Sequence, residues 1–290
     1  MGLGARISAP FVFWAFAMRV ALGLEYRGTA YCGWQSQSSG CGVQDYVEKA
    51  VAAFLGEPAR VICAGRTDTG VHATAQVVHL DTLLARPVQA WVRGVNSFLP
   101  PDIRILWAHF LPEPAECREE ERFHARFSAI SRRYCYRLVD RAVAPGIEHG
   151  LVGWFHAPLD LDRMQAAAHL LLGEKDFSAF RSAECQAKSP VKVMQAVRVF
   201  REGTTLIFDL RASAFLHHMV RNIVGCLVYV GAGRQDADWF AAVIASKDRA
   251  RCAPTFSPDG LYLVGVEYDG RWMLPAFPVR GVAAEGGQND

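Results

Sequence analysis

Residues 60–81 read RVICAGRTDTGVHATAQVVHLD, and this stretch predicts two strands joined by a short turn. The apolar runs 60–63 and 75–81 are typical of strands, and the turn between them carries Arg66, Asp68 and two glycines. Gly, Asp and Thr are common turn residues because they adopt positive φ or bond their own backbone. Loops held by rigid strands also commonly carry catalytic side chains. The stretch alone leaves both interpretations open.

Strands and helices alternate on both sides of this stretch. In the first half, we predict strands at 20–26, 60–63, 75–81 and 103–108 and helices at 43–55 and 88–98. In the second half, we predict strands at 134–139, 195–200, 204–210 and 261–266 and helices at 160–172, 215–229 and 237–245. This repeated order predicts an α+β chain of two ferredoxin-like halves that are related by a weak internal repeat.

The predicted halves occupy residues 18–128, which carry Asp68, and residues 129–277. The apolar run 11–17 loosely resembles a secretory signal, but it is short and directly precedes a predicted strand. We therefore expect residues 1–17 to be a disordered extension, and the polar, glycine-containing end 278–290 to be a disordered tail. No segment approaches the roughly 20 apolar residues of a membrane-spanning helix, and we expect a cytoplasmic protein with no membrane partner.

Arginine dominates the basic residues, with 26 Arg and 5 Lys in a chain of formal net charge +2. The planar guanidinium suits phosphates and base edges, although a compositional bias explains the count equally well. Residues 122–141 hold six Arg interleaved with Phe and Tyr. Such a segment fits an RNA-facing strand, and it also fits a solvated strand with core aromatics.

The eight cysteines show no C-x-x-C spacing, which argues against a zinc ribbon or a thioredoxin-like redox motif. Several of them lie inside apolar strand or helix patterns, as buried thiols do. We therefore expect free cysteines in a reducing compartment, without a disulfide framework.

A second informative segment, FLHHMVRNIVG at 215–225, places His217, His218, Arg221 and Asn222 at a predicted helix start. His217 and Arg221 have the spacing of paired metal ligands, but Arg does not ligate metals, so we expect no metal site. The chain lacks a phosphate-binding P-loop and a G-x-S-x-G nucleophile elbow. Carboxylate chemistry is what remains: a nearby Arg favours the ionised form of Asp68, and Arg66 and Arg221 are the candidate partners.

Several short sequence motifs, taken together, resemble those of the TruA-type tRNA pseudouridine synthases over about residues 18–277. The blocks that carry this resemblance are AGRTDTGVHA at 64–73, QVVH at 76–79, FHARFSA at 123–129, RRY at 132–134, LGEKDF at 172–177, HHMVRNIVG at 217–225 and GLYL at 260–263. Each block is short, but their order and spacing together are specific. The resemblance implies the pseudouridine synthase fold, in which two ferredoxin-like halves form a mainly antiparallel sheet flanked by helices, with a central active-site cleft.

This resemblance implies isomerisation of uridine to pseudouridine at positions 38, 39 and 40 of the tRNA anticodon stem-loop, by a homodimer that uses neither cofactor nor metal. Asp68 matches the catalytic nucleophile and Arg221 the arginine that pairs with it. Tyr134 matches the tyrosine that stacks on the target uracil, and Leu263 an apolar residue of the uracil pocket. We assign RNA contacts to further polar residues: Arg66, Arg126, Arg132, Arg133, His217, His218 and Asn222.

Two residues depart from the family pattern: Arg27 replaces a usual acid and Thr69 a usual Ala. We expect Thr69 to leave the activity intact. A non-catalytic RNA-binding module, or an N-glycosidase that releases free base, would use many of the same residues. The RNA-binding module has no need of Asp68, whereas the N-glycosidase requires it.

Overall fold

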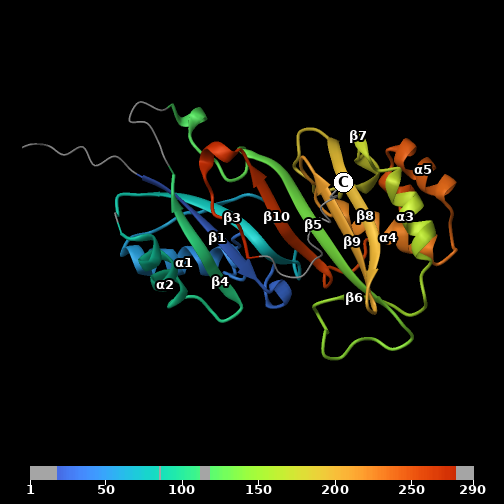
Figure 1. Cartoon of the computed structure of the whole chain (residues 1–290), viewed down its shortest axis with the longest axis horizontal. Coiled ribbons are helices and arrows are strands. Elements are labelled where there is room, and N and C mark those ends of the chain that lie inside the picture. Colours follow the sequence, from blue (N-terminus) through green and yellow to red (C-terminus); the bar gives the residue numbers. More distant parts are fainter. Residues whose placement is uncertain (1–17, 85, 112–117, 279–290) are drawn as a thin grey trace, which may run out of the picture.

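A computed structural model describes residues 18–84, 86–111 and 118–278 of the chain. The expected extension 1–17 and nearly all of the expected tail 278–290 lie outside the described residues. The architecture is mixed α+β, with one ten-stranded, mainly antiparallel sheet in the order β4-β1-β3-β10-β5-β9-β8-β7 (Figure 1). The short strands β2 and β6 pair with β3 and β5, off this path. The predicted fold class is confirmed.

The first half of the sheet is built from strands close to their predicted positions. Its elements are β1 (Met18–Tyr26), α1 (Val43–Leu55), β2 (Ile62–Cys63), β3 (His72–Thr82), α2 (Val88–Asn96) and β4 (Ile103–Phe110). Helix α1 ends at Gly56, whose φ of +80° gives the left-handed cap that glycine adopts at low cost. Strand β1 pairs antiparallel with both β3 and β4, and it therefore forms the centre of this half.

The second half supplies the other half of the sheet and three further α-helices. Its elements are β5 (Ala129–Asp140), β6 (Gly153–Phe155), α3 (Leu161–His169), β7 (Gly173–Asp176), β8 (Val191–Glu202), β9 (Thr205–Ala212), α4 (Met219–Gly231), α5 (Ala237–Ser246) and β10 (Leu261–Tyr268). Asp160 caps α3, since its side chain accepts a hydrogen bond from the Arg163 N–H. Strands β8 and β9 form an antiparallel hairpin, and Gly203 in its turn has φ +57°.

Strand β10 joins the two halves into one sheet. It pairs in parallel with β3 and antiparallel with β5, so the last strand of the chain lies between strands of different halves (Figure 1). The boundary predicted at residues 128 and 129 falls directly before β5 and stays a prediction. A large apolar core extends across both halves, and a smaller one lies on the other side of β1, where Ala21 and Trp107 pack with Phe123 and Trp272.

Two expectations about this chain are wrong. Helix α4 begins at Met219, so residues 215–218, predicted to be helical, form an irregular approach to it. Cys32 and Cys41 form a disulfide, which contradicts the expectation that all cysteines are free. Their spacing of nine residues signals no known motif, and a loop brings them together by folding back on itself. None of the helices in the described part of the chain has the length and apolar character that crossing a membrane requires.

Candidate functional site

Asp68 lies on the connection between β2 and β3, and a neighbouring loop holds this connection in place. The Trp34 N–H donates to the Thr67 carbonyl at 2.9 Å, and the Tyr26 hydroxyl shares a 2.8 Å hydrogen bond with Thr67 Oγ1. Thr67 and Tyr26 are both buried. The residue before the carboxylate is therefore fixed through its backbone and its side chain.

The turn that presents Asp68 also depends on two glycines. The Val71 N–H donates to the Asp68 carbonyl at 3.1 Å, and Gly70, with φ +80°, completes this turn. Gly33, with φ +84°, lies so close that a Cβ there would be 2.8 Å from the Thr67 carbonyl oxygen. The backbone of residues 67–69 thus packs directly against the loop closed by the Cys32–Cys41 disulfide.

Arg221 reaches Asp68 from the other half of the molecule. Its Nη1 donates to Asp68 Oδ2 at 3.1 Å, and its Nε donates to the Phe256 carbonyl at 2.8 Å. The side chains of Arg221 and Asp68 are only 14% and 17% exposed, so water screens this ion pair weakly. Of the two partners considered for Asp68, Arg221 is the one that the fold brings to it, across 153 residues of sequence.

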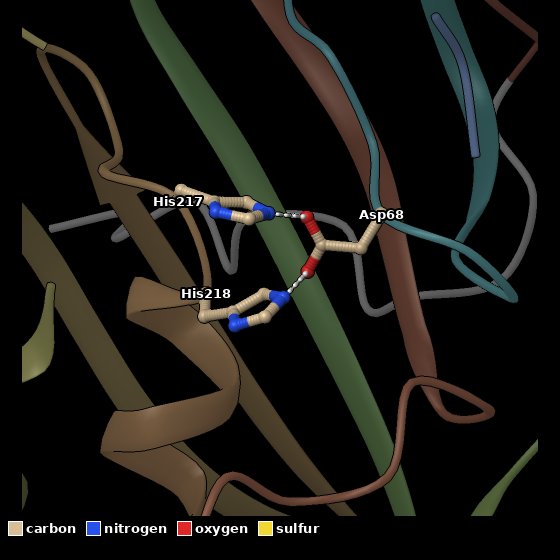
Figure 2. A group of neighbouring side chains, drawn as sticks. All are labelled: Asp68, His217 and His218. Atoms are coloured by element: carbon tan, nitrogen blue, oxygen red, sulfur yellow. Dashed lines mark ion pairs between the residues drawn. The ribbon is translucent and has the colours of Figure 1, made fainter. Parts of the chain in front are cut away.

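Two histidines complete the surroundings of the carboxylate. His217 Nε2 lies 3.4 Å from Asp68 Oδ1, and His218 Nε2 lies 3.5 Å from Oδ2 (Figure 2). His218 directly precedes α4 and has φ +63°, a left-handed conformation that is uncommon for residues other than glycine. Burial lowers the pKa of His218, and the Asp68 carboxylate opposes this effect.

Tyr134 and Leu263 are neighbours, and they lie beside the loop that carries Asp68. They are paired across β5 and β10, and both side chains are buried. The Tyr134 ring packs edge-on against Phe215, and its hydroxyl lies 3.8 Å from the position a Cβ on Gly65 would take. Burial raises the pKa of Tyr134, so the phenol is neutral at physiological pH. The fold therefore brings together four of the predicted site residues: Asp68, Arg221, Tyr134 and Leu263.

The remaining predicted RNA contacts divide into exposed and enclosed side chains. Arg66 and Arg126 are exposed, and His217 and His218 are about one-third exposed. Exposed side chains at the rim of the site are available to a ligand. These four residues are compatible with the predicted role.

Arg132 and Asn222 are buried, and the partly exposed Arg133 is held in an ion pair. Arg132 is buried and donates to four backbone carbonyls, among them that of Ala64 at 3.0 Å, and burial lowers its pKa. Arg133 is paired with Asp209 at 2.7 Å. Asn222 is fully buried and donates to the Phe180 carbonyl. The contacts of these three residues support structural roles, and their RNA contacts stay predictions.

The contacts of His217 and His218 with Asp68 were not foreseen from the sequence, which suggested only RNA contact. Their consecutive positions give no helical or strand spacing with an acid, and Asp68 lies about 150 residues away. The left-handed conformation of His218 was not predicted either, because positive φ is uncommon for residues other than glycine. One oxygen of Asp68 and one nitrogen of each ring all lie within 4.8 Å of one another, a donor set that could hold a metal ion.

Comparisons with known proteins found a matching family model and several similar sequences. Residues 24–118 and 167–269 match the family model described as tRNA pseudouridine synthase. A protein of Thiobacillus denitrificans named tRNA pseudouridine synthase A is 54% identical over 258 residues, which are 89% of this chain and 96% of that protein. A protein of the same name from Dechloromonas aromatica is 56% identical over 258 residues, or 89% and 95% of the two chains.

Proposed function

Because the chain belongs to the tRNA pseudouridine synthase family, whose members isomerise uridine to pseudouridine, we propose that it modifies uridines 38, 39 and 40 of the tRNA anticodon stem-loop with Asp68 as its nucleophile. The observation that carries this proposal is the ion pair between Asp68 and Arg221, which joins the two halves of the molecule at the carboxylate. A protein that only binds RNA has no need of such a weakly exposed carboxylate.

The reaction requires a uridine that has left the base stack. An enzyme that acts on a base pays a few kcal/mol to flip it into a pocket. Stacking on an aromatic ring returns about 1–3 kcal/mol per base, and Tyr134 is the aromatic side chain assigned to this contact. Leu263, its neighbour across β10, supplies an apolar wall.

Asp68 then attacks, either at the ribose C1′ or at the uracil ring, and the N-glycosidic bond breaks. The detached uracil rotates and rejoins the ribose through a ring carbon. That carbon loses its proton, the freed ring nitrogen gains one, and the carboxylate is released unchanged. Arg221 holds the nucleophilic carboxylate in place through the Oδ2 contact, while its Nε bond to the Phe256 carbonyl fixes the guanidinium. Both side chains are poorly exposed, and exclusion of water prevents loss of the free base between the two steps.

The tRNA is the proposed partner, and the exposed Arg66 and Arg126 are the proposed phosphate contacts at the rim. A homodimer in the cytoplasm, acting without a cofactor, is part of the same proposal and is supported by the family resemblance.

The test compares Asp68→Asn with Thr69→Ala in single-turnover assays of pseudouridine formation on tRNA transcripts. The Asn variant keeps the shape of the side chain but removes its charge, and we expect it to be inactive while still binding tRNA. The neighbouring Thr69 is exposed, and its Ala variant is expected to match the parent. Turnover by Asp68→Asn at the parent rate would refute the nucleophile assignment, and release of free uracil by the parent protein would favour an N-glycosidase.

A further inference from the structure

We propose that Asp68, His217 and His218 form a binding site for a divalent transition metal of the zinc type, and that metal bound there inhibits the enzyme. The binding part rests only on the side chains of this chain. The inhibitory part rests on the proposed function, because it requires Asp68 to be the nucleophile.

The distances between the three side chains approach those of a metal site, since one ligand atom from each lies within 4.8 Å of the others. A Zn²⁺ ion binds His nitrogen and carboxylate oxygen at about 2.0–2.2 Å, so two ligands of a tetrahedral site lie about 3.4 Å apart. The Nε2 atoms of His217 and His218 lie 3.4 and 3.5 Å from the nearest Asp68 oxygens. Both rings direct Nε2 at the same carboxylate, as Figure 2 shows. Two imidazoles and one carboxylate with an open fourth position are a common zinc ligand set.

The ion pair with Arg221 leaves room for this ligand set. Arg221 Nη1 and His218 Nε2 approach Oδ2, whereas His217 Nε2 approaches Oδ1. A metal held by Oδ1 and the two imidazoles requires the His218 ring to turn from Oδ2 toward Oδ1, and it would leave the Arg221 bond to Oδ2 in place. Carboxylates that ligate metals commonly accept such an outer hydrogen bond.

Two features limit the affinity of the site. The Arg221 guanidinium places a positive charge beside the metal, which repels it. The Nδ1 atom of His217 has no hydrogen-bond partner among the described residues, so this ring lacks the outer contact that usually orients a ligating histidine. We therefore expect a dissociation constant on the order of micromolar rather than nanomolar.

The ligand chemistry also predicts selectivity. Imidazole nitrogens suit Zn²⁺, Co²⁺ and Ni²⁺, whereas Mg²⁺ prefers oxygen ligands and retains its water. Millimolar Mg²⁺, which tRNA needs for its own fold, would therefore leave the site empty. A bound Zn²⁺ would occupy the carboxylate oxygen that attacks the substrate, and the enzyme would lose activity until a chelator removes the ion.

The first experiment measures binding without RNA. The metal-free full-length protein is titrated with Zn²⁺ by calorimetry and with Co²⁺ by visible absorption, which reports tetrahedral coordination. The parent carries the Cys252→Ser change, because Cys226 and Cys252 have their Sγ atoms 3.0 Å apart and could bind metal themselves. The variants Asp68→Asn, His217→Gln and His218→Gln are compared with His149→Gln, which removes an exposed histidine elsewhere.

We expect one saturable site whose dissociation constant rises at least tenfold in each of the three variants and is unchanged in His149→Gln. Unfolding curves of all variants identify any that fail to fold. Because three separate ligands are substituted, the test still stands if one variant does not fold. Equal affinity in the parent and the folded site variants, or no saturable binding, would overturn the site.

The second experiment measures pseudouridine formation at rising Zn²⁺ in millimolar Mg²⁺. Inhibition at the concentration that fills the site, reversed by a chelator, supports the proposal. Full activity with the site occupied would overturn its inhibitory part. Should Asp68→Asn remain active, the proposed function fails while the binding result stands, so the two failures are distinguishable.

Discussion

Substitution of Gly33 by Ala tests whether the loop beside the carboxylate sets the position of Asp68. Two costs arise at this residue. The φ of +84° costs an L-residue about 1–2 kcal/mol. The new Cβ would also lie 2.8 Å from the Thr67 carbonyl oxygen and 3.1 Å from the Asp68 carbonyl carbon, where ordinary contact begins at 3.4 Å. The backbone beneath Asp68 must therefore move by about half an ångström.

Gly56→Ala is the matched control, because Gly56 has nearly the same φ, +80°, with no heavy atom within 4 Å of the new Cβ. We expect Gly56→Ala to lose about 1 kcal/mol of unfolding free energy with unchanged kcat. Gly33→Ala should lose more than this and should lower kcat about tenfold to a hundredfold, since misplacement of about 1 Å costs about a hundredfold.

Urea unfolding and single-turnover pseudouridine assays give the two quantities for each variant. Equal unfolding free energies and equal kcat values in the two variants would refute the reasoning, because the close approach to Thr67 would then have no energetic consequence.

Three further predictions follow from contacts elsewhere in the molecule. Arg221→Met should lower kcat about a hundredfold or more, and Arg221→Lys should recover part of this by restoring charge without the Nε bond to Phe256; equal rates in the two variants, measured by single turnover, would show that charge does not matter. Cys41→Ser should lose about 2–3 kcal/mol of unfolding free energy under oxidising conditions, and reductant should lower the urea midpoint of the parent but not of the variant. Burial lowers the pKa of His79 to about 3. Between pH 6.5 and 3, His79 is therefore protonated in the unfolded chain but neutral in the folded chain. Stability should therefore fall as pH falls, by about 2 kcal/mol from pH 7 to 5 for this group. In His79→Gln, which can still accept the Ala125 N–H, the slope of unfolding free energy against pH should flatten; an unchanged slope would contradict the assignment.

Local signals predicted much of the fold. Helix α1 occupies the predicted residues because its apolar spacing is regular and Gly56 ends it. The hairpin at Gly203 and the Asp160 cap likewise depend on a few adjacent residues. Such features are predictable because the residues that decide them are neighbours in the chain.

Long-range arrangement was less accessible to sequence reasoning. An apolar pattern marks 261–266 as a strand, but it does not state that β10 pairs with β3 in parallel as well as with β5. Residues 215–218 were predicted to be helical, but His218 is left-handed and α4 begins only at Met219. The His217 and His218 rings lie beside Asp68 instead. The sequence offered both Arg66 and Arg221 as partners of Asp68, and only the family resemblance favoured Arg221, because no local pattern connects residues 153 positions apart.

The central place of β10 affects the order in which the chain can fold during synthesis. Residues 261–268 leave the ribosome long after β3 and β5, and until then the edges of β3 and β5 that pair with β10 lack this partner. Unpaired strand edges favour association with other chains. The nascent protein therefore passes through a vulnerable interval, and closure of the sheet by its last strand ends that interval.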